Sequence, residues 1–130
     1  MAGSSLYRLK KDNRLLNAAA FGRVFQKASN SRDRWFTVLC RKNDKDIARL
    51  GLAISKKHCR HATGRNRIKR VVRESFRQHQ AELAGLDVVV INQAAAASAA
   101  NGQLFDSMSL HWQRCRRARD ADARRKEHDG

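Results

Sequence analysis

Residues 86–91 of this chain read LDVVVI, and this apolar segment constrains the fold more than any other feature of the sequence. Alternate side chains of a β-strand point to opposite faces of a sheet, so Leu86, Val88 and Val90 share one face while Val89 and Ile91 share the other. A strand that is apolar on both faces is typical of the middle of a covered sheet. We therefore expect a sheet with helices packed on it.

The sequence on both sides of this strand has the periodicity of amphipathic helices. Residues 17–28 place Phe21, Val24, Phe25 and Ala28 on one helical face. A second pattern covers residues 64–77, and a third places Leu104, Phe105, Met108, Trp112 and Cys115 on one stripe. Three helices are therefore predicted.

Two further segments have the composition of strands. RWFTVLCR (34–41) is rich in aromatic and β-branched residues, and ARLGLAISKK (48–57) alternates large and small side chains. SNSRDR (29–34) is interpreted as a loop, NDKD as a turn, and AAAASAANG (94–102) as mostly loop. The order is helix, strand, strand, helix, strand, helix, with an optional short strand near the first. This order predicts an α/β (α+β) two-layer sandwich with a small mixed sheet.

The length of 130 residues is that of one domain, in which residues 1–16 form a basic N-terminal arm and residues 120–130 a flexible tail. No apolar run reaches the roughly 18 residues of a membrane span, and the N-terminus does not resemble a secretory signal, so a cytoplasmic protein is expected. Cys40, Cys59 and Cys115 are odd in number and widely spaced, which favours reduced thiols.

The charge of the chain indicates its class of partner. Lys and Arg number 28 against 12 Asp and Glu, which gives a formal net charge of +16 and a pI near 11.2. So much charge of one sign on a small domain indicates a polyanionic partner, for which nucleic acid is the first candidate and an acidic membrane surface the second.

This charge is concentrated in residues 56–77, which hold nine basic side chains and one acidic one for a net +8. A helix over GRNRIKRVVRESFR has an apolar side and a basic side. The apolar side consists of Ile68, Val71, Val72 and Phe76, and the basic side of Lys69, Arg70, Arg73 and Arg77. A face made only for solubility would mix both signs, so we interpret the basic side as a phosphate-binding surface.

Arg65, Asn66 and Arg67 are expected at or just before the first turn of that helix. Unpaired backbone N–H groups and the positive end of the helix dipole favour a phosphate at this end. The helix and its start are therefore both predicted to attract anions.

The strand at 48–57 separates its side chains by size. Leu50, Leu52 and Ile54 share one face, while Gly51, Ala53 and Ser55 share the other and leave it almost without bulk. The small face could let a ligand backbone approach the sheet or make room for a packed helix, and the residues alone favour the helix.

Metal chemistry finds little support in the sequence. His58, Cys59 and His61 are adjacent but have no second ligand pair, so they are interpreted as loop residues. Asp and Glu are too scattered for a two-metal nuclease centre belonging to the protein. No metal site or catalytic residue is therefore predicted in the chain itself.

The combination FGRVF, GLAISKK, RNRIKRVVRESFR and LDVVVI, in this order and spacing, resembles the protein subunit of bacterial ribonuclease P over residues 9–119. The resemblance implies a left-handed βαβ crossover and a role as protein cofactor of a ribonucleoprotein enzyme. That enzyme removes the 5′ leader from precursor tRNA, and its RNA subunit supplies the catalytic centre and the Mg²⁺ ions. The partners implied are the catalytic RNA and the precursor leader, with neither membrane nor DNA.

The resemblance also implies which residues meet each RNA. The contacts with the catalytic RNA would be Arg65, Asn66, Arg67, Lys69, Arg70 and Arg73. The cleft for the leader would be lined by Phe21, Phe25, Ser55, Lys56 and Lys57. Aromatic rings and cations together suit a single strand of variable sequence, because every base has a π-face and every nucleotide a phosphate.

Several alternatives stay open from the sequence. Phe21 and Phe25 could fill the core instead of lining a cleft. Leu39 stands where some relatives have Tyr, which leaves a stacking contact there in doubt. A structural RNA-binding protein of ribosomal type would also suit the basic helix and the α/β body.

Overall fold

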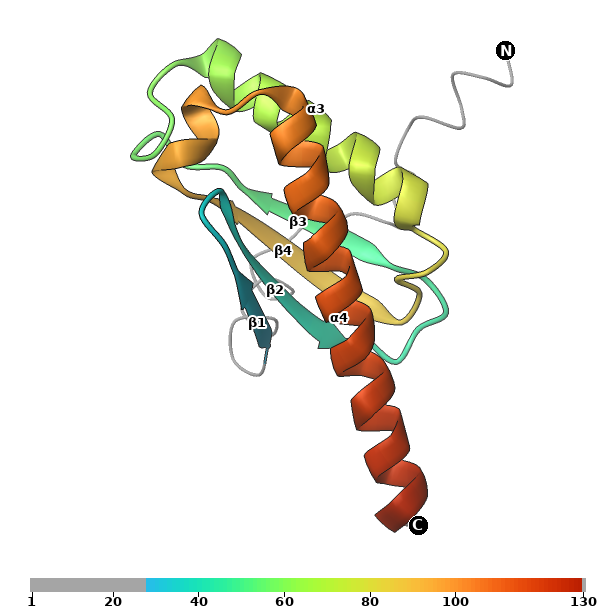
Figure 1. The fold of residues 1–130 in the computed structure, drawn as a ribbon. Helices are drawn as coiled ribbons and strands as arrows, with labels where there is room; N and C mark the ends of the chain where they lie inside the picture. Colours follow the sequence, from blue (N-terminus) through green and yellow to red (C-terminus); the bar gives the residue numbers. More distant parts are fainter. Residues whose placement is uncertain (1–27, 130) are drawn as a thin grey trace, which may run out of the picture.

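The computed structural model describes residues 28–129, with side chains as far as residue 123. The elements are β1 (Ser29–Arg32), β2 (Phe36–Lys42), β3 (Arg49–Ala53), α3 (Ala62–His79), β4 (Leu86–Asn92), the 3₁₀ helix η2 (Ala94–Ser98) and α4 (Asn101–Asp129) (Figure 1). The predicted N-terminal arm and the predicted helix at 17–28, except for Ala28, lie outside the described residues.

The four described strands form one mixed sheet in the order β1-β2-β4-β3. β2 pairs antiparallel with both β1 and β4, whereas β3 and β4 run parallel and are joined by α3. The small mixed sheet predicted from the sequence is thus confirmed, with the apolar strand β4 in its interior. The left-handedness of the β3-α3-β4 crossover stays a prediction.

Helices α3 and α4 cover one face of the sheet, so the predicted two-layer sandwich is confirmed (Figure 1). The buried layer joins alternate residues of β4 to the apolar side of α3 and the stripe of α4. On the opposite face of the sheet Val89 is buried among Ala28, Leu39, Ala53 and Ile91. Both faces of β4 are therefore apolar, as its sequence indicates: one packs against α3 and α4, and the other holds the buried Val89.

Some local predictions were wrong. SNSR, interpreted as part of a loop, forms the edge strand β1, because Ser29–Arg32 pairs in full register with β2 and only Asp33 begins the turn. The alanine-rich connection, interpreted as mostly loop, forms η2. The backbone of α4 continues helically to Asp129, and the flexibility expected of residues 120–130 stays a prediction. Two of the three predicted α-helices lie within residues 28–129 and are present there as α3 and α4, while the third falls outside the described residues.

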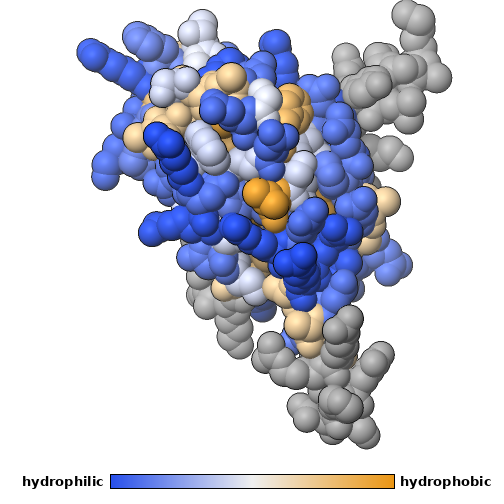
Figure 2. Space-filling view, viewed as in Figure 1, coloured by the Kyte–Doolittle hydropathy of each residue, from blue (hydrophilic) through white to orange (hydrophobic). Residues whose placement is uncertain are grey.

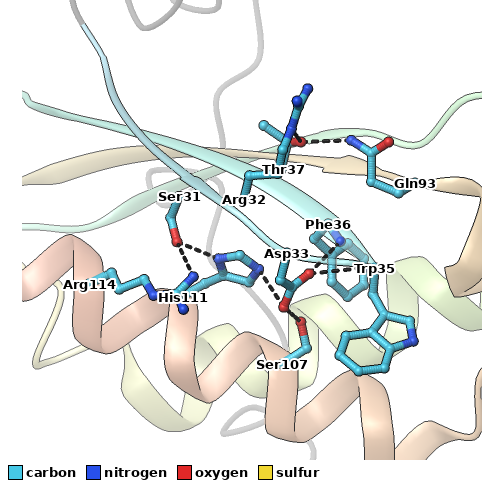
Figure 3. A network of polar contacts seen from close by, with 10 residues as sticks. All are labelled: Ser31, Arg32, Asp33, Trp35, Phe36, Thr37, Gln93, Ser107, His111 and Arg114. Atoms are coloured by element: carbon cyan, nitrogen blue, oxygen red, sulfur yellow. Dashed lines mark hydrogen bonds and ion pairs between the residues drawn. The ribbon is translucent and has the colours of Figure 1, made fainter.

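A polar network under α4 fixes the β1–β2 turn to that helix (Figure 3). His111, fully buried, has Nδ1 2.7 Å from Ser31 Oγ and Nε2 3.1 Å from Asp33 Oδ2. Ser107 Oγ donates a hydrogen bond to the same carboxylate oxygen, and Arg114 donates to Ser31 Oγ at 3.2 Å. These contacts join residues about 80 positions apart in the sequence, so they position β1 against α4.

Candidate nucleic-acid interface

The outward side of α3 carries a continuous basic stripe. Asn66, Arg70 and Arg73 are exposed, and together with Arg77 they line a shallow hollow of about 310 Å³. Steps of three or four residues put these side chains on one helical face. The opposite face is buried at Ile68, Val71, Val72, Ser75 and Phe76, so the predicted division of α3 into an apolar and a basic side is confirmed.

The start of α3 differs from the prediction in register. The helix begins at Ala62 with His61 as N-cap, and the N–H of Arg65 donates to the carbonyl of His61, so residues 65–67 follow the first turn instead of preceding it. The first turn holds no acidic residue, and no side chain in the described part of the chain caps it. The positive end of the α3 dipole is therefore not compensated locally.

Arg65 and Arg67 are directed at the protein's own carbonyl groups. Arg65 donates through one terminal nitrogen to the carbonyls of Cys59 and Arg60, at 3.0 and 2.9 Å. Arg67 donates to acceptors in the segment from η2 to the start of α4. The six residues predicted to meet the catalytic RNA thus divide into two arginines bonded inward and an outward set, which consists of Asn66, Arg70, Arg73 and the half-buried Lys69.

The loop between β3 and α3 is held by a buried asparagine. The side chain of Asn92, fully buried at the end of β4, accepts from the N–H of Ser55 at 2.8 Å and donates to its carbonyl at 3.4 Å. Ser55 then begins a turn, because its carbonyl accepts from the N–H of Cys59. Lys56 and Lys57 are exposed on that turn, whereas Ser55 is fixed by the backbone.

The small-residue side of β3, with Gly51 and Ala53, lies on the sheet face away from α3 and α4. Gly51 and Leu39 both pair with Val89 across the sheet, so Leu39 shares this face with the small residues of β3. At one end of the face Gln93 Nε2 donates to Thr37 Oγ1 at 2.7 Å, and Arg32 Nε donates to the same oxygen at 3.3 Å (Figure 3). Phe21 and Phe25, predicted to line the cleft, lie outside the described residues.

Sequence reasoning missed three residues that shape this region. The sequence predicts Arg77 on the basic side of α3 but gives no reason to count it among the RNA contacts, although it lines the same hollow as Arg70. Asn92 could have been noticed as the one polar residue that ends an apolar strand. Thr37 gave no signal, because a threonine within a strand is ordinary.

The carboxylates of the described residues do not form a magnesium site. The described side chains, up to residue 123, include no group of three His, Cys, Asp or Glu that could hold a metal ion. The carboxylate of Asp87 accepts hydrogen bonds from Arg49 at both oxygens and from the side-chain amide of Asn43. The hydrogen bonds from Arg49 to Asp87 raise the pKa of Arg49 above its ordinary value. Oxygen ligands for Mg²⁺ are thus not gathered in this part of the chain.

Comparison with known proteins identifies the family. The Ribonuclease P family model matches residues 9–116. The ribonuclease P protein component of Vibrio cholerae is 42% identical over 113 residues, which cover 87% of this chain and 96% of that protein. That of Thioalkalivibrio sulfidiphilus is 48% identical over 101 residues, covering 78% and 84%. The chain belongs to the ribonuclease P protein family.

Solved structures of ribonuclease P proteins have the same fold. A Staphylococcus aureus RNase P protein mutant with defective mRNA degradation activity superposes with a TM-score of 0.74 at 32% identity, over 85% of this chain and 92% of its own. The RNase P protein from Thermotoga maritima gives 0.70 at 30% identity, over 78% and 96%. The predicted family and its RNA-binding role in tRNA processing are therefore confirmed.

Two surface properties accompany the ribonuclease P fold. No helix within residues 28–129 is long and apolar enough to cross a membrane. The side of the molecule on which α4 lies is mainly hydrophilic (Figure 2). The α3 stripe, with three exposed residues along one helical face, has the chemistry that fits an RNA partner.

Gly64 allows the loop before α3 to pack closely on the helix. A Cβ added at Gly64 would lie 2.9 Å from Cys59 Sγ, and Cys59 is buried. Gly64→Ala is expected to lower the free energy of unfolding by about 1–3 kcal/mol, as overpacking does. Urea denaturation measures this effect. The double variant Gly64→Ala/Cys59→Ala, which removes the sulfur, is expected to recover part of the loss, and an equal loss in both variants would contradict the contact.

Proposed function

We propose that this chain is the RNA-binding cofactor of a ribonuclease P holoenzyme that removes the 5′ leader from precursor tRNA. The observation that carries the proposal is the exposed basic stripe on α3, in a chain whose family is that of ribonuclease P proteins. In this proposal the catalytic RNA performs the hydrolysis, and the protein binds and positions RNA. It works in the cytoplasm, where tRNA is made.

The division of α3 supports a direct role for its outward residues. The phosphates of the catalytic RNA contact the outward set, which consists of Asn66, Lys69, Arg70 and Arg73. The two arginines suit this role because a guanidinium donates two parallel hydrogen bonds to a phosphate. Arg65 holds the preceding loop through the carbonyls of Cys59 and Arg60. The surface is thus formed by exposed donors on a helix whose loop is fixed.

The opposite face of the sheet is proposed to receive the 5′ leader. On this face β3 has the small residues Gly51 and Ala53, which supports a close approach of a single strand to the sheet. Phe21 and Phe25 are proposed to stack on bases there. Lys56 and Lys57 are exposed near the end of β3 and would meet its phosphates, while Ser55 keeps their turn in place.

Magnesium is proposed to be bound by the RNA subunit, where it supplies the charge stabilisation and activated water of phosphodiester hydrolysis. The described residues of the protein offer no cluster of oxygen ligands for it. The protein's contribution is positive charge, which lowers the repulsion between catalytic RNA and substrate. We therefore expect the protein to matter most when Mg²⁺ is scarce.

The deciding experiment is cleavage of precursor tRNA at low Mg²⁺ with a bacterial ribonuclease P RNA alone, the protein alone, and both together. Cleavage at the mature 5′ end is expected only when both are present. Equal cleavage with and without the protein, despite tight RNA binding, would overturn the proposal and favour a structural RNA-binding protein.

The α3 stripe can be tested by its dependence on salt. Arg70→Ala and Arg73→Ala are each expected to weaken binding of the catalytic RNA and to reduce the slope of log K against log salt by about 0.7–0.9, the value for one lost phosphate contact. Filter binding between low and moderate salt measures this slope. Arg117→Ala, an exposed arginine on α4, removes the same charge elsewhere and should leave the slope nearly unchanged. A uniform effect of all three variants would contradict a defined interface on α3.

A further inference from the structure

We infer that Arg67, although it stands within the basic motif of α3, is a positioning residue that fastens the η2–α4 connection to α3 and does not itself hold a phosphate. One terminal nitrogen of Arg67 donates to the carbonyl of Ala99 at 3.0 Å and to Asn101 Oδ1 at 2.8 Å. The other donates to the carbonyls of Ala96 and Ala97, at 3.3 and 3.2 Å.

These four hydrogen bonds use the groups that a phosphate would need. A guanidinium has five N–H donors, four of them on its two terminal nitrogens. Both terminal nitrogens of Arg67 are directed at acceptors of the protein, with two acceptors each, and only Nε has no acceptor among these bonds. Bidentate binding of a phosphate takes two neighbouring N–H groups, so it would break at least one of these bonds.

The η2 segment explains why a guanidinium is needed at this place. Its sequence is alanine-rich, so it has few side chains of its own to bond the carbonyls at its end, and of those that Arg67 meets the Ala96 carbonyl also accepts the N–H of Ala99. Ala96 and Ala99 are buried, and Ala99 turns the chain toward α4. Carbonyls in such a position need a partner, and a positive charge is favourable at the C-terminal end of a helix.

The same contacts link the start of α4 to the RNA-binding helix. Asn101 is the first residue of α4, and its side chain accepts from Arg67. Figure 1 shows η2 and the start of α4 beside the first turns of α3. Through Arg67, the position of α3 is tied to the connection that leads into the second helix. Asn66, the neighbour of Arg67, and Arg70, one turn further on, are thereby presented on a fixed surface.

Arg70 provides the matched comparison, because it lies three residues from Arg67 on the same helix and is exposed. Lysine keeps the positive charge and can still meet a phosphate as a point charge. It cannot reach four acceptors with one ammonium group. Substitution of Arg by Lys should therefore preserve RNA binding at a residue that contacts phosphate, such as Arg70. It should loosen the local structure at a residue that bonds several backbone carbonyls, such as Arg67.

The first measurement is hydrogen exchange on the free protein, which is independent of the proposed function. Arg67→Lys is expected to speed exchange in a peptide covering residues 93–104 by about tenfold, the scale of losing hydrogen bonds to a charged donor, whereas Arg70→Lys leaves it unchanged. Unchanged exchange in Arg67→Lys would overturn the inference, whatever happens with RNA.

The second measurement is affinity for the catalytic RNA, and this step rests on the proposed function. Arg67→Lys is expected to weaken binding several-fold with an unchanged salt slope, and Asn101→Ala, which alters no charge, should weaken it in the same direction. A lower salt slope in Arg67→Ala, with full affinity in Arg67→Lys and Asn101→Ala, would show that Arg67 meets phosphate and overturn the inference. Failure of Arg70→Ala to affect binding would instead count against the proposed function, and the exchange result would still decide the role of Arg67.

Discussion

Replacing Trp112 by Ala is expected to lower the free energy of unfolding by about 3–5 kcal/mol, the usual cost of removing a large buried aromatic side chain. Trp112 lies on α4 and is fully buried. Its ring meets Phe76 of α3 edge to face, with centroids 5.9 Å apart and an interplanar angle of 69°. Its Nε1–H donates to Ser75 Oγ at 2.9 Å. The substitution therefore removes both the apolar and the polar contact between the helices.

Such a loss is large for a small domain, whose total stability is typically about 5–15 kcal/mol. Urea denaturation followed by circular dichroism measures it. Leu110→Ala is the matched control, because Leu110 lies two residues away on α4 and is 51% exposed, and about 0.5 kcal/mol or less is expected. Ser75→Ala should cost an intermediate 1–3 kcal/mol, because it leaves a buried N–H without an acceptor. A Trp112 variant as stable as the Leu110 variant would contradict this account of α3–α4 packing.

The helices and the central strand could be predicted because burial leaves a periodic pattern. Ile68, Val72 and Phe76 repeat at helical spacing and are all fully buried in the structure. The edge strand β1 left no such pattern. This strand lies at the edge of the sheet, where it pairs only with β2, and its sequence is polar. Only Ser31 of its four residues is buried. Backbone pairing with β2, which sequence periodicity does not reveal, made it a strand.

The candidate site was predictable only as a set of charges. The sequence indicates that Arg67 and Arg70 lie on or near a basic surface, but both are arginines in a basic segment and look alike. Which of them is bonded inward depends on carbonyls about 30 residues later in the chain, at Ala96–Asn101. Position in three dimensions, and not composition, separates an exposed arginine from one that is bonded to the protein's own carbonyls.

The stability of the protein is expected to fall in two steps on acidification, because of the pair Asp33 and His111. Burial lowers the pKa of His111 below its ordinary 6.5, with Asp33 opposing and Arg114 adding to the shift. Burial would raise the pKa of Asp33, but hydrogen bonds from Ser107 and from the N–H groups of Phe36 and Trp35 outweigh it and hold that pKa below 3.8.

Both shifts act in the same direction. Where the unfolded chain binds more protons than the folded one, stability decreases as the pH is lowered. The unfolded chain binds more protons at His111 from about pH 6.5 down to the pKa of His111 in the folded protein. At Asp33 it does so from about pH 3.8 down to the pKa of Asp33 in the folded protein. Arg114 donates to Ser31 Oγ, so the Ser31 hydroxyl can donate to Nδ1 and leave the proton of neutral His111 on Nε2, facing Asp33. Protonating either group therefore changes the contacts that join His111 to Ser31 and Asp33.

Asp33→Ala is expected to cost about 3 kcal/mol at neutral pH, the upper end for hydrogen bonds to a charged group, because several donors lose one acceptor together. Trp35 and Phe36 donate their N–H groups to Oδ1 at 2.8 and 2.9 Å, so the β1–β2 turn loses its fixing point. The difference from the unsubstituted protein should shrink as the pH falls below 3.8, where the carboxylate becomes protonated in the unfolded chain. Urea midpoints between pH 3 and 8 measure both effects, with His111→Asn expected to lose the step near pH 6.5 and keep the lower one. A constant cost of Asp33→Ala across that range would mean that the carboxylate's charge does not stabilise the turn.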